Sequence, residues 1–224
     1  MTFTDHIVDI ALTTTPPDDA LVSARSQLEE ILAALGHGVV AIDDAHPGGR
    51  PSPMNRAWRA VIATAALAQK HRWHAIGVTV VALQDVSEHD GTSAAAATAV
   101  ATGSVIADRI AAALESTSTA DRWSHRAVAG LVGAGVAAGR LLDLDEAQLR
   151  NVVGLCATQA AGLHAVDESE SANVQLAKTA ADAVEAAVLA RHGFTSSADG
   201  IGGRRGLFAL LAPDATWQGD IGAA

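Results

Sequence analysis

The sequence is poor in aromatic residues and in cysteine. Of its 224 residues only 3% are aromatic, none of them tyrosine, whereas 49% are hydrophobic. A core without large rings has to be built from Ala, Val and Leu, which favours closely packed helices. The single cysteine, Cys156, excludes an internal disulfide and fits a reducing compartment, so we expect a cytoplasmic protein.

Positive charge and long apolar runs are also scarce. The net charge is −10 at pH 7 and no stretch is rich in Lys and Arg, whereas nucleic-acid phosphates select basic surfaces. Charges or glycines break the apolar runs before they reach the roughly 18 residues that a membrane span needs. The first residues lack the basic and apolar regions of a secretory signal. We therefore expect neither nucleic acid nor a membrane as a partner.

Apolar residues recur at helical spacing along most of the chain. Leu21, Leu28 and Leu35, for example, share one face of a helix that follows a Pro-Pro pair and stops at Gly36. The same reasoning predicts a loop over 37–54 and helices over 18–35, 56–70, 74–87, 92–114, 128–142, 147–163 and 172–191. No segment alternates with a period of two for long, so we expect no sheet.

One of these helices contains four glycines: Gly130, Gly133, Gly135 and Gly139. Glycine weakens an isolated helix, so this pattern predicts a buried central helix against whose backbone other helices press. The last long helix ends at Gly193, in the position of a left-handed C-cap. The predicted fold is all-α, a compact multi-helix bundle. Residues 1–224 form a single domain in this interpretation, with peripheral tails at about 1–15 and 213–224.

Several phrases follow one another in the order found in one enzyme family. They are Trp123-Ser124-His125, Gly130-x-x-Gly133, Arg140-Leu141-Leu142-x-Leu144-Asp145, Gln159-Ala160-Ala161-Gly162, His192-Gly193-Phe194-Thr195 and Gly202-Gly203-Arg204-Arg205-Gly206. With these phrases the chain resembles the MmgE/PrpD family, which includes 2-methylcitrate dehydratase and cis-aconitate decarboxylase. The resemblance covers most of the chain and aligns His74 with a family histidine. It implies a helical domain, a homodimer, and proton transfer on a small organic acid without a cofactor.

The phrases that carry the family's chemistry are the ones that differ. Residues 64–67, Thr-Ala-Ala-Leu, stand where the family has an acidic motif, and Ser124 stands where it has a histidine, with His125 one residue later. The family's cations before the last long helix are replaced by Ala172, Asn173 and Gln175. The chain also stops where the family begins a lid-like domain. We therefore expect a shortened member without the lid, or one whose lid is a separate partner chain.

The remaining basic residues suggest a site. One cationic cluster precedes His74 and another surrounds His125, and Lys178 matches a Lys or Arg common in the family. Histidine titrates near neutral pH and cations bind carboxylates, whereas the alternative interpretation is a solvated polar surface. The candidate catalytic residues are His74 and His125, and the candidate substrate-binding residues are Arg72, Ser124, Arg126 and Lys178.

Four other features attract attention. His164 has acidic neighbours, but they share one polar loop, so we expect no metal. Cys156 lies in an apolar helix and is interpreted as an inert core residue. The segment 202–206 lacks the Lys-Ser/Thr pair of a phosphate loop and is interpreted as a turn. Asp43 and Asp44 are candidates for a substitute carboxylate, although they lie far upstream of His74.

Two functions remain open. The first is a repurposed enzyme of the lyase or isomerase type that catalyses elimination, isomerisation or decarboxylation of a small organic acid or related metabolite. The second is a non-catalytic descendant that serves as a binding or assembly module, or one half of a split enzyme. Ala- and Gly-rich helices without a lid would expose apolar surface, so we expect a homodimer in both cases.

Overall fold

Nine α-helices and two short 3-10 helices make up the computed structural model, which describes residues 2–36 and 51–215. These residues contain no strand, which confirms the predicted all-α fold. The elements are α1 (Phe3–Thr13), α2 (Asp18–Gly36), α3 (Pro53–Ala63), η1 (Ala65–Gln69), α4 (His74–Leu83), α5 (Ala94–Glu115), α6 (His125–Leu141), α7 (Glu146–Gln159), η2 (His164–Val166), α8 (Ser171–Arg191) and α9 (Leu207–Leu211).

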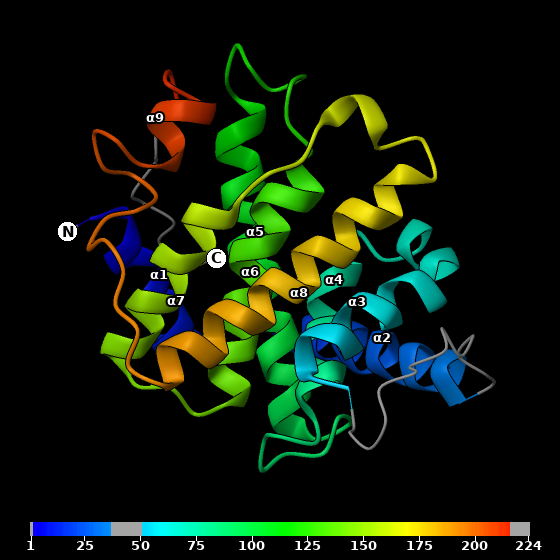
Figure 1. Cartoon of the computed structure of the whole chain (residues 1–224). Helices are drawn as coiled ribbons and strands as arrows, with labels where there is room; N and C mark the ends of the chain where they lie inside the picture. Colours follow the sequence, from blue (N-terminus) through cyan, green and yellow to red (C-terminus); the bar gives the residue numbers. More distant parts are fainter. Residues whose placement is uncertain (1, 37–50, 216–224) are drawn as a thin grey trace.

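Helix α6 lies at the centre of the bundle. It packs against α4, α5, α7 and α8, and α8 crosses the molecule diagonally in Figure 1. Helices α2, α3 and α4 lie together on one side of the bundle, and α1 and α7 lie on the other. Every residue of α6 from Ala127 to Gly139 is buried. The prediction of a buried, glycine-rich central helix is confirmed.

The contact between α5 and α6 is a contact of backbones. Gly103 of α5 faces Gly133 of α6, so a Cβ added at Gly103 would stand 2.5 Å from the Gly133 carbonyl oxygen. A Cβ at Gly133 would meet the Gly103 carbonyl oxygen in the same way, and the Ala107 side chain as well. Side-chain carbons do not approach oxygens this closely, so only glycine permits this spacing.

Helix α1 corrects the expectation of a peripheral tail over residues 1–15. A capping box starts it: Thr2 Oγ1 accepts from the Asp5 backbone N–H at 3.1 Å, and Asp5 Oδ2 accepts from the Thr2 N–H at 2.6 Å. Ile7 and Ala11 are buried, and the helix packs against α5 and α7. Its apolar face is therefore part of the core.

The other predicted helices have the expected places with shifted ends. The largest difference is that the helix predicted over 56–70 ends at Ala63, and a 3-10 turn follows. The Thr64 hydroxyl donates to the Ala60 carbonyl oxygen there, a side-chain bond that commonly bends helices. Gly193 has a φ of 87°, which confirms the predicted left-handed C-cap. The predicted loop over 37–54 lies outside the described residues except at its end.

We expected no apolar run long enough to cross a membrane, and helix α5 is an exception. By length and composition it is the one described helix that meets this criterion, but 67% of its apolar window is buried inside the protein. It packs against α2, α4 and α6 as well as α1. Its apolar character is therefore that of a core helix.

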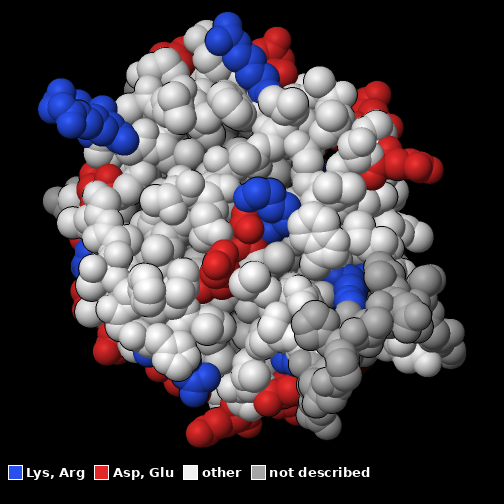
Figure 2. All heavy atoms as spheres, viewed as in Figure 1, with Lys and Arg blue, Asp and Glu red and all other residues white. Residues whose placement is uncertain are grey.

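Charged side chains are sparse on the face shown in Figure 2. On the face shown in Figure 2, acidic and basic side chains occur in small separate groups surrounded by uncharged surface. Several large apolar side chains are exposed, and Leu210 is the most exposed at 75%. This face therefore offers no continuous basic stripe.

The backbone contact predicts a strong effect of a single methyl group. We expect Gly103→Ala to lower the free energy of unfolding by about 1–3 kcal/mol, because the new Cβ would push the Gly133 carbonyl and separate α5 from α6. Gly36→Ala is the matched control, because no atom of the described residues lies within 4 Å of a Cβ at that position. Urea unfolding measures both. Equal stability of the two variants would contradict the proposed importance of this contact.

Candidate functional site

His74 begins α4 and has no exposed surface. Its Nε2 lies 2.8 Å from Thr64 Oγ1, and the Thr64 hydroxyl already donates its proton to the Ala60 carbonyl oxygen at 2.6 Å. Thr64 therefore accepts from the imidazole, which assigns the hydrogen of His74 to Nε2. His74 Nδ1 is then a buried acceptor, and it has no hydrogen-bond partner among the described residues.

Burial keeps this imidazole neutral. It lowers the pKa of His74 to about 4, with smaller contributions from the charges of His71 and Arg126. A neutral, fully covered imidazole does not meet a substrate in solution, so the position does not support the predicted catalytic contact. The sequence interpretation relied on the cations that precede His74, but all ten residues of α4 are buried.

Arg126 fixes the turn that leads into α4. From the second residue of α6, its Nη2 donates to the Ala68 carbonyl oxygen at 2.5 Å and its Nε to the Arg72 carbonyl oxygen at 3.4 Å. Burial lowers the pKa of Arg126, and the charge of Asp167 opposes this effect. Arg126 is therefore engaged by backbone carbonyls, as a brace between α6 and residues 68–72.

Glu115, at the end of α5, joins two of the candidate residues. Its Oε1 accepts from Arg72 Nη2 at 2.8 Å and lies 3.5 Å from His125 Nδ1. Asp108 adds a second carboxylate, whose Oδ1 lies 3.5 Å from Arg72 Nη1 and accepts from Trp73 Nε1 at 2.9 Å. His125 Nε2 is buried without a hydrogen-bond partner among the described residues. A cation, a carboxylate and a histidine thus meet where α4, α5 and α6 adjoin.

Sequence reasoning missed Glu115 and Asp108. They lie seven residues apart, two turns along one helix, in a segment that otherwise reads as an apolar core helix. Two carboxylates on one face of such a helix were the available signal. Their cationic partner, Arg72, is distant in sequence, so the spacing alone did not connect them.

The other two candidates have structural contacts. Ser124 is buried and caps α6, with its Oγ accepting from the Ala127 N–H at 3.3 Å. Its own N–H donates to the Gly162 carbonyl oxygen at 3.1 Å. Lys178 pairs with Asp182 one turn along α8. The structure therefore brings Arg72, His125 and Arg126 together, covers His74, and uses Ser124 and Lys178 elsewhere.

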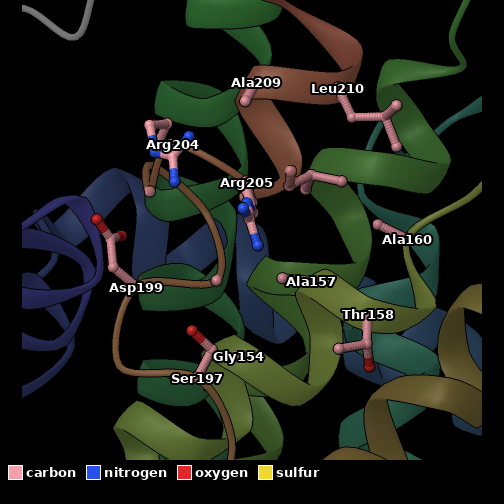
Figure 3. Close-up of a pocket in the computed structure, with 14 residues that line it drawn as sticks. Gly154, Ala157, Thr158, Ala160, Ser197, Asp199, Arg204, Arg205, Ala209 and Leu210 are labelled. Atoms are coloured by element: carbon pink, nitrogen blue, oxygen red, sulfur yellow. The ribbon is translucent and has the colours of Figure 1, made fainter.

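Three surface hollows are described, and the first two adjoin, because Asp199, Gly203, Arg204 and Ala209 line both. The largest, about 850 Å³, lies between α7 and the segment that leads into α9 (Figure 3). The second, about 470 Å³, lies beside α1. The third, about 320 Å³, lies between α2 and α5 and is lined by Lys70, His71 and Arg72. Neither His74 nor His125 lines any of these three, but Arg72 connects the third hollow with Glu115.

The motifs interpreted as structural have different outcomes. Cys156 is buried against Gly135, and burial raises its pKa, which agrees with an inert thiol. The segment 202–206 forms a turn, as predicted. His164 Nδ1 lies 3.3 Å from Asp167, and the described residues contain no group of three or more potential metal ligands. Asp43 and Asp44 lie outside the described residues.

The buried imidazole predicts a specific dependence of stability on pH. In the unfolded chain His74 binds a proton below its usual pKa of 6.5. In the folded protein His74 does not bind this proton until the pH falls to about 4. The free energy of unfolding therefore falls as the pH drops through this window, by about 2 kcal/mol from this group at pH 5. Urea unfolding at pH 7 and pH 5 measures the loss.

His74→Gln is the control for this prediction, because an amide retains a donor for Thr64 but does not titrate. We expect the variant to lose less stability between pH 7 and pH 5 than the parent. Asp5 and Glu30, whose hydrogen bonds lower their pKa values to about 2, contribute at lower pH, since their unfolded values are 3.8 and 4.5. An identical loss in both proteins would contradict the assignment.

Comparison with known proteins agrees with the resemblance in the sequence. The family model of the MmgE/PrpD N-terminal domain matches residues 4–220. The match includes α1, which the structure shows to be part of the core. A search of curated proteins gives no match. Since the family model spans nearly the whole length of 224 residues, the chain belongs to the MmgE/PrpD family.

Proposed function

We propose that the chain is an enzyme of its family that transfers a proton on a small organic acid, with His125 as the acid or base. The observation that carries this proposal is the shared oxygen of Glu115, which holds Arg72 at 2.8 Å and His125 at 3.5 Å. Arg72 also lines the 320 Å³ hollow between α2 and α5. A carboxylate-binding cation and a histidine therefore lie within a few ångströms of one another.

Glu115 orients the imidazole in this proposal. Glu115 Oε1 lies 3.5 Å from Nδ1 and favours the tautomer with its hydrogen on Nδ1, so Nε2 of His125 is the atom that takes the proton. The guanidinium of Arg72 is half exposed and can exchange Glu115 or Asp108 for a substrate carboxylate. Nε2 is covered in the structure, so the reaction requires the start of α6 to move when the acid binds.

The other residues support the site from a distance. Arg126 braces the turn that carries Arg72, and the neutral His74 bonded to Thr64 secures the start of α4. We propose no cofactor, because a proton transfer on a small organic acid needs only an acid or base, His125, and a cation for the carboxylate, Arg72. Ser124 and Lys178 have no role in the reaction.

We further propose a homodimer, as the family resemblance implies, and a cytoplasmic location, as the single cysteine favours. Exposed apolar side chains supply surface for a second subunit or for a separate lid-like chain; among them are Leu163, Val174 and Phe194, each more than half exposed. A lid would also exclude water from an acid bound at Arg72 and strengthen the charge pairing there.

A second candidate function is a non-catalytic binding or assembly module. The observation that favours it is the burial of both histidines at the atoms that chemistry would need, His74 Nδ1 and His125 Nε2. In addition, Arg72 already pairs with Glu115 and Asp108. In this candidate function the ion pairs only hold helix ends together.

Hydrogen exchange distinguishes these two functions without knowledge of the final product. The protein is incubated in D₂O with a panel of small di- and tricarboxylic acids, and NMR measures replacement of C–H by C–D. We expect the parent protein to catalyse this exchange. With His125→Gln we expect the exchange rate to fall by a factor of about 100 or more, since removal of a general base costs at least this factor. Arg72→Gln is expected to raise KM more than it lowers kcat.

Lys178→Gln is the matched control for the loss of a cation, because its ion pair with Asp182 lies along α8. We expect its exchange rate to equal that of the parent. An unchanged rate in His125→Gln would remove His125 from the mechanism. Absence of exchange with every acid of the panel would favour the non-catalytic module.

A further inference from the structure

The 850 Å³ hollow between α7 and the segment that leads into α9 has a floor of very small residues. Gly154 and Ala157 of α7 and Ala160, which follows the helix, form this floor, and the segment 199–206 forms the opposite wall. Figure 3 shows Arg205 extending from this wall over Ala157, with Arg204 beside it. Small side chains below and two long cations above leave a volume of about 850 Å³ that is open to solvent.

The wall that carries the arginines is held in a defined conformation. The Leu207 N–H donates to the Gly200 carbonyl oxygen at 2.8 Å, and the Phe208 N–H to the Ile201 carbonyl oxygen at 3.0 Å. Ile201 is completely buried beneath the loop. A Cβ at Gly206 would stand 2.7 Å from the Ile201 carbonyl oxygen, so the loop closes on itself as only glycine allows. The two arginines therefore project from a fixed base.

Neither arginine is neutralised by the rest of the described chain. Arg204 and Arg205 are exposed and form no hydrogen bond or ion pair with a described residue, and their backbone N–H groups are also unpaired there. Asp199, the carboxylate that lines the hollow, accepts from the Gly202 N–H at 3.1 Å and the Thr4 hydroxyl at 3.4 Å. By contrast, Arg72 is engaged by two carboxylates.

Two adjacent cations without counter-charges repel one another, and an anion between them removes this repulsion. Guanidinium groups bind oxyanions through paired N–H donors, and the unpaired backbone N–H groups add further donors. The turn lacks the lysine and hydroxyl residue of a nucleotide-binding phosphate loop, so the positive charge that binds the anion comes from Arg204 and Arg205.

We propose that this hollow is a binding site for a compact oxyanion that carries at least two negative charges, either a phosphate ester or a polycarboxylate. The anionic groups lie between Arg204 and Arg205, and the carbon skeleton lies over Gly154 and Ala157. The site is separate from the cluster at Glu115, because Arg72, Glu115 and His125 do not line this hollow. It therefore does not depend on the proposed proton transfer.

Calorimetry with two probes tests this site. Inorganic pyrophosphate represents phosphate esters, and propane-1,2,3-tricarboxylate represents polycarboxylates. We expect at least one probe to bind to the parent protein, and the binding to weaken as salt rises because exposed charges are screened. Arg204→Gln with Arg205→Gln is expected to weaken this binding about 10-fold or more, which corresponds to about 1.4 kcal/mol. The probe with the higher affinity identifies the chemical source of the ligand.

Arg25→Gln with Arg191→Gln is the matched control, because it removes the same charge from exposed positions outside the hollow. We expect it to bind the probes like the parent. Thermal unfolding checks that both double variants remain folded. Equal affinity of the two double variants would show that only net charge matters and would overturn the site, as would failure of both probes to bind the parent.

Discussion

The backbone contact between Gly103 and Gly133 is the constraint on which the rest of the structure depends. It lets the backbones of α5 and α6 come into contact, and the alanine-rich faces around it then pack without large side chains. The same approach determines where the end of α5 lies relative to the start of α6. Glu115 and His125 occupy those two ends, so the spacing of the core also sets the spacing of the candidate site.

The start of α6 also explains why neighbouring candidate residues make different contacts. Ser124 and Arg126 start α6, and both satisfy backbone groups, one as a cap and the other as a brace for the turn before α4. His125 lies between them and has a side-chain carboxylate as its partner. Three consecutive residues thus have three different tasks, because Ser124 precedes the helix in an extended conformation and the side chains of His125 and Arg126 differ in direction by about 100°.

Much of the fold follows from the sequence, but less of the site does. The glycines of α6 and the cap at Gly193 have local causes, so periodicity and turn chemistry predict them. The break at Thr64 depends on a hydroxyl bond to the preceding turn, and the burial of His74 depends on the helices that surround α4. The pairing of Glu115 with Arg72 joins residues 43 apart in sequence, so no local pattern reveals it.

A core built from alanine, valine and glycine has little room for ionisable groups. His74 is the one His, Asp, Glu, Lys or Arg among the buried polar residues of the described chain, and burial keeps it uncharged. The charged side chains that form ion pairs therefore lie at partly exposed positions, as Glu30, Asp108 and Lys178 do on the surfaces of their helices. Two sites differ in one respect: Arg72 has acidic neighbours, whereas no acidic residue of segments 2–36 and 51–215 binds Arg204 or Arg205. A ligand anion at Arg72 must compete with the carboxylates of Glu115 and Asp108. An anion at Arg204 and Arg205 meets no such competition, so we expect it to bind more tightly there.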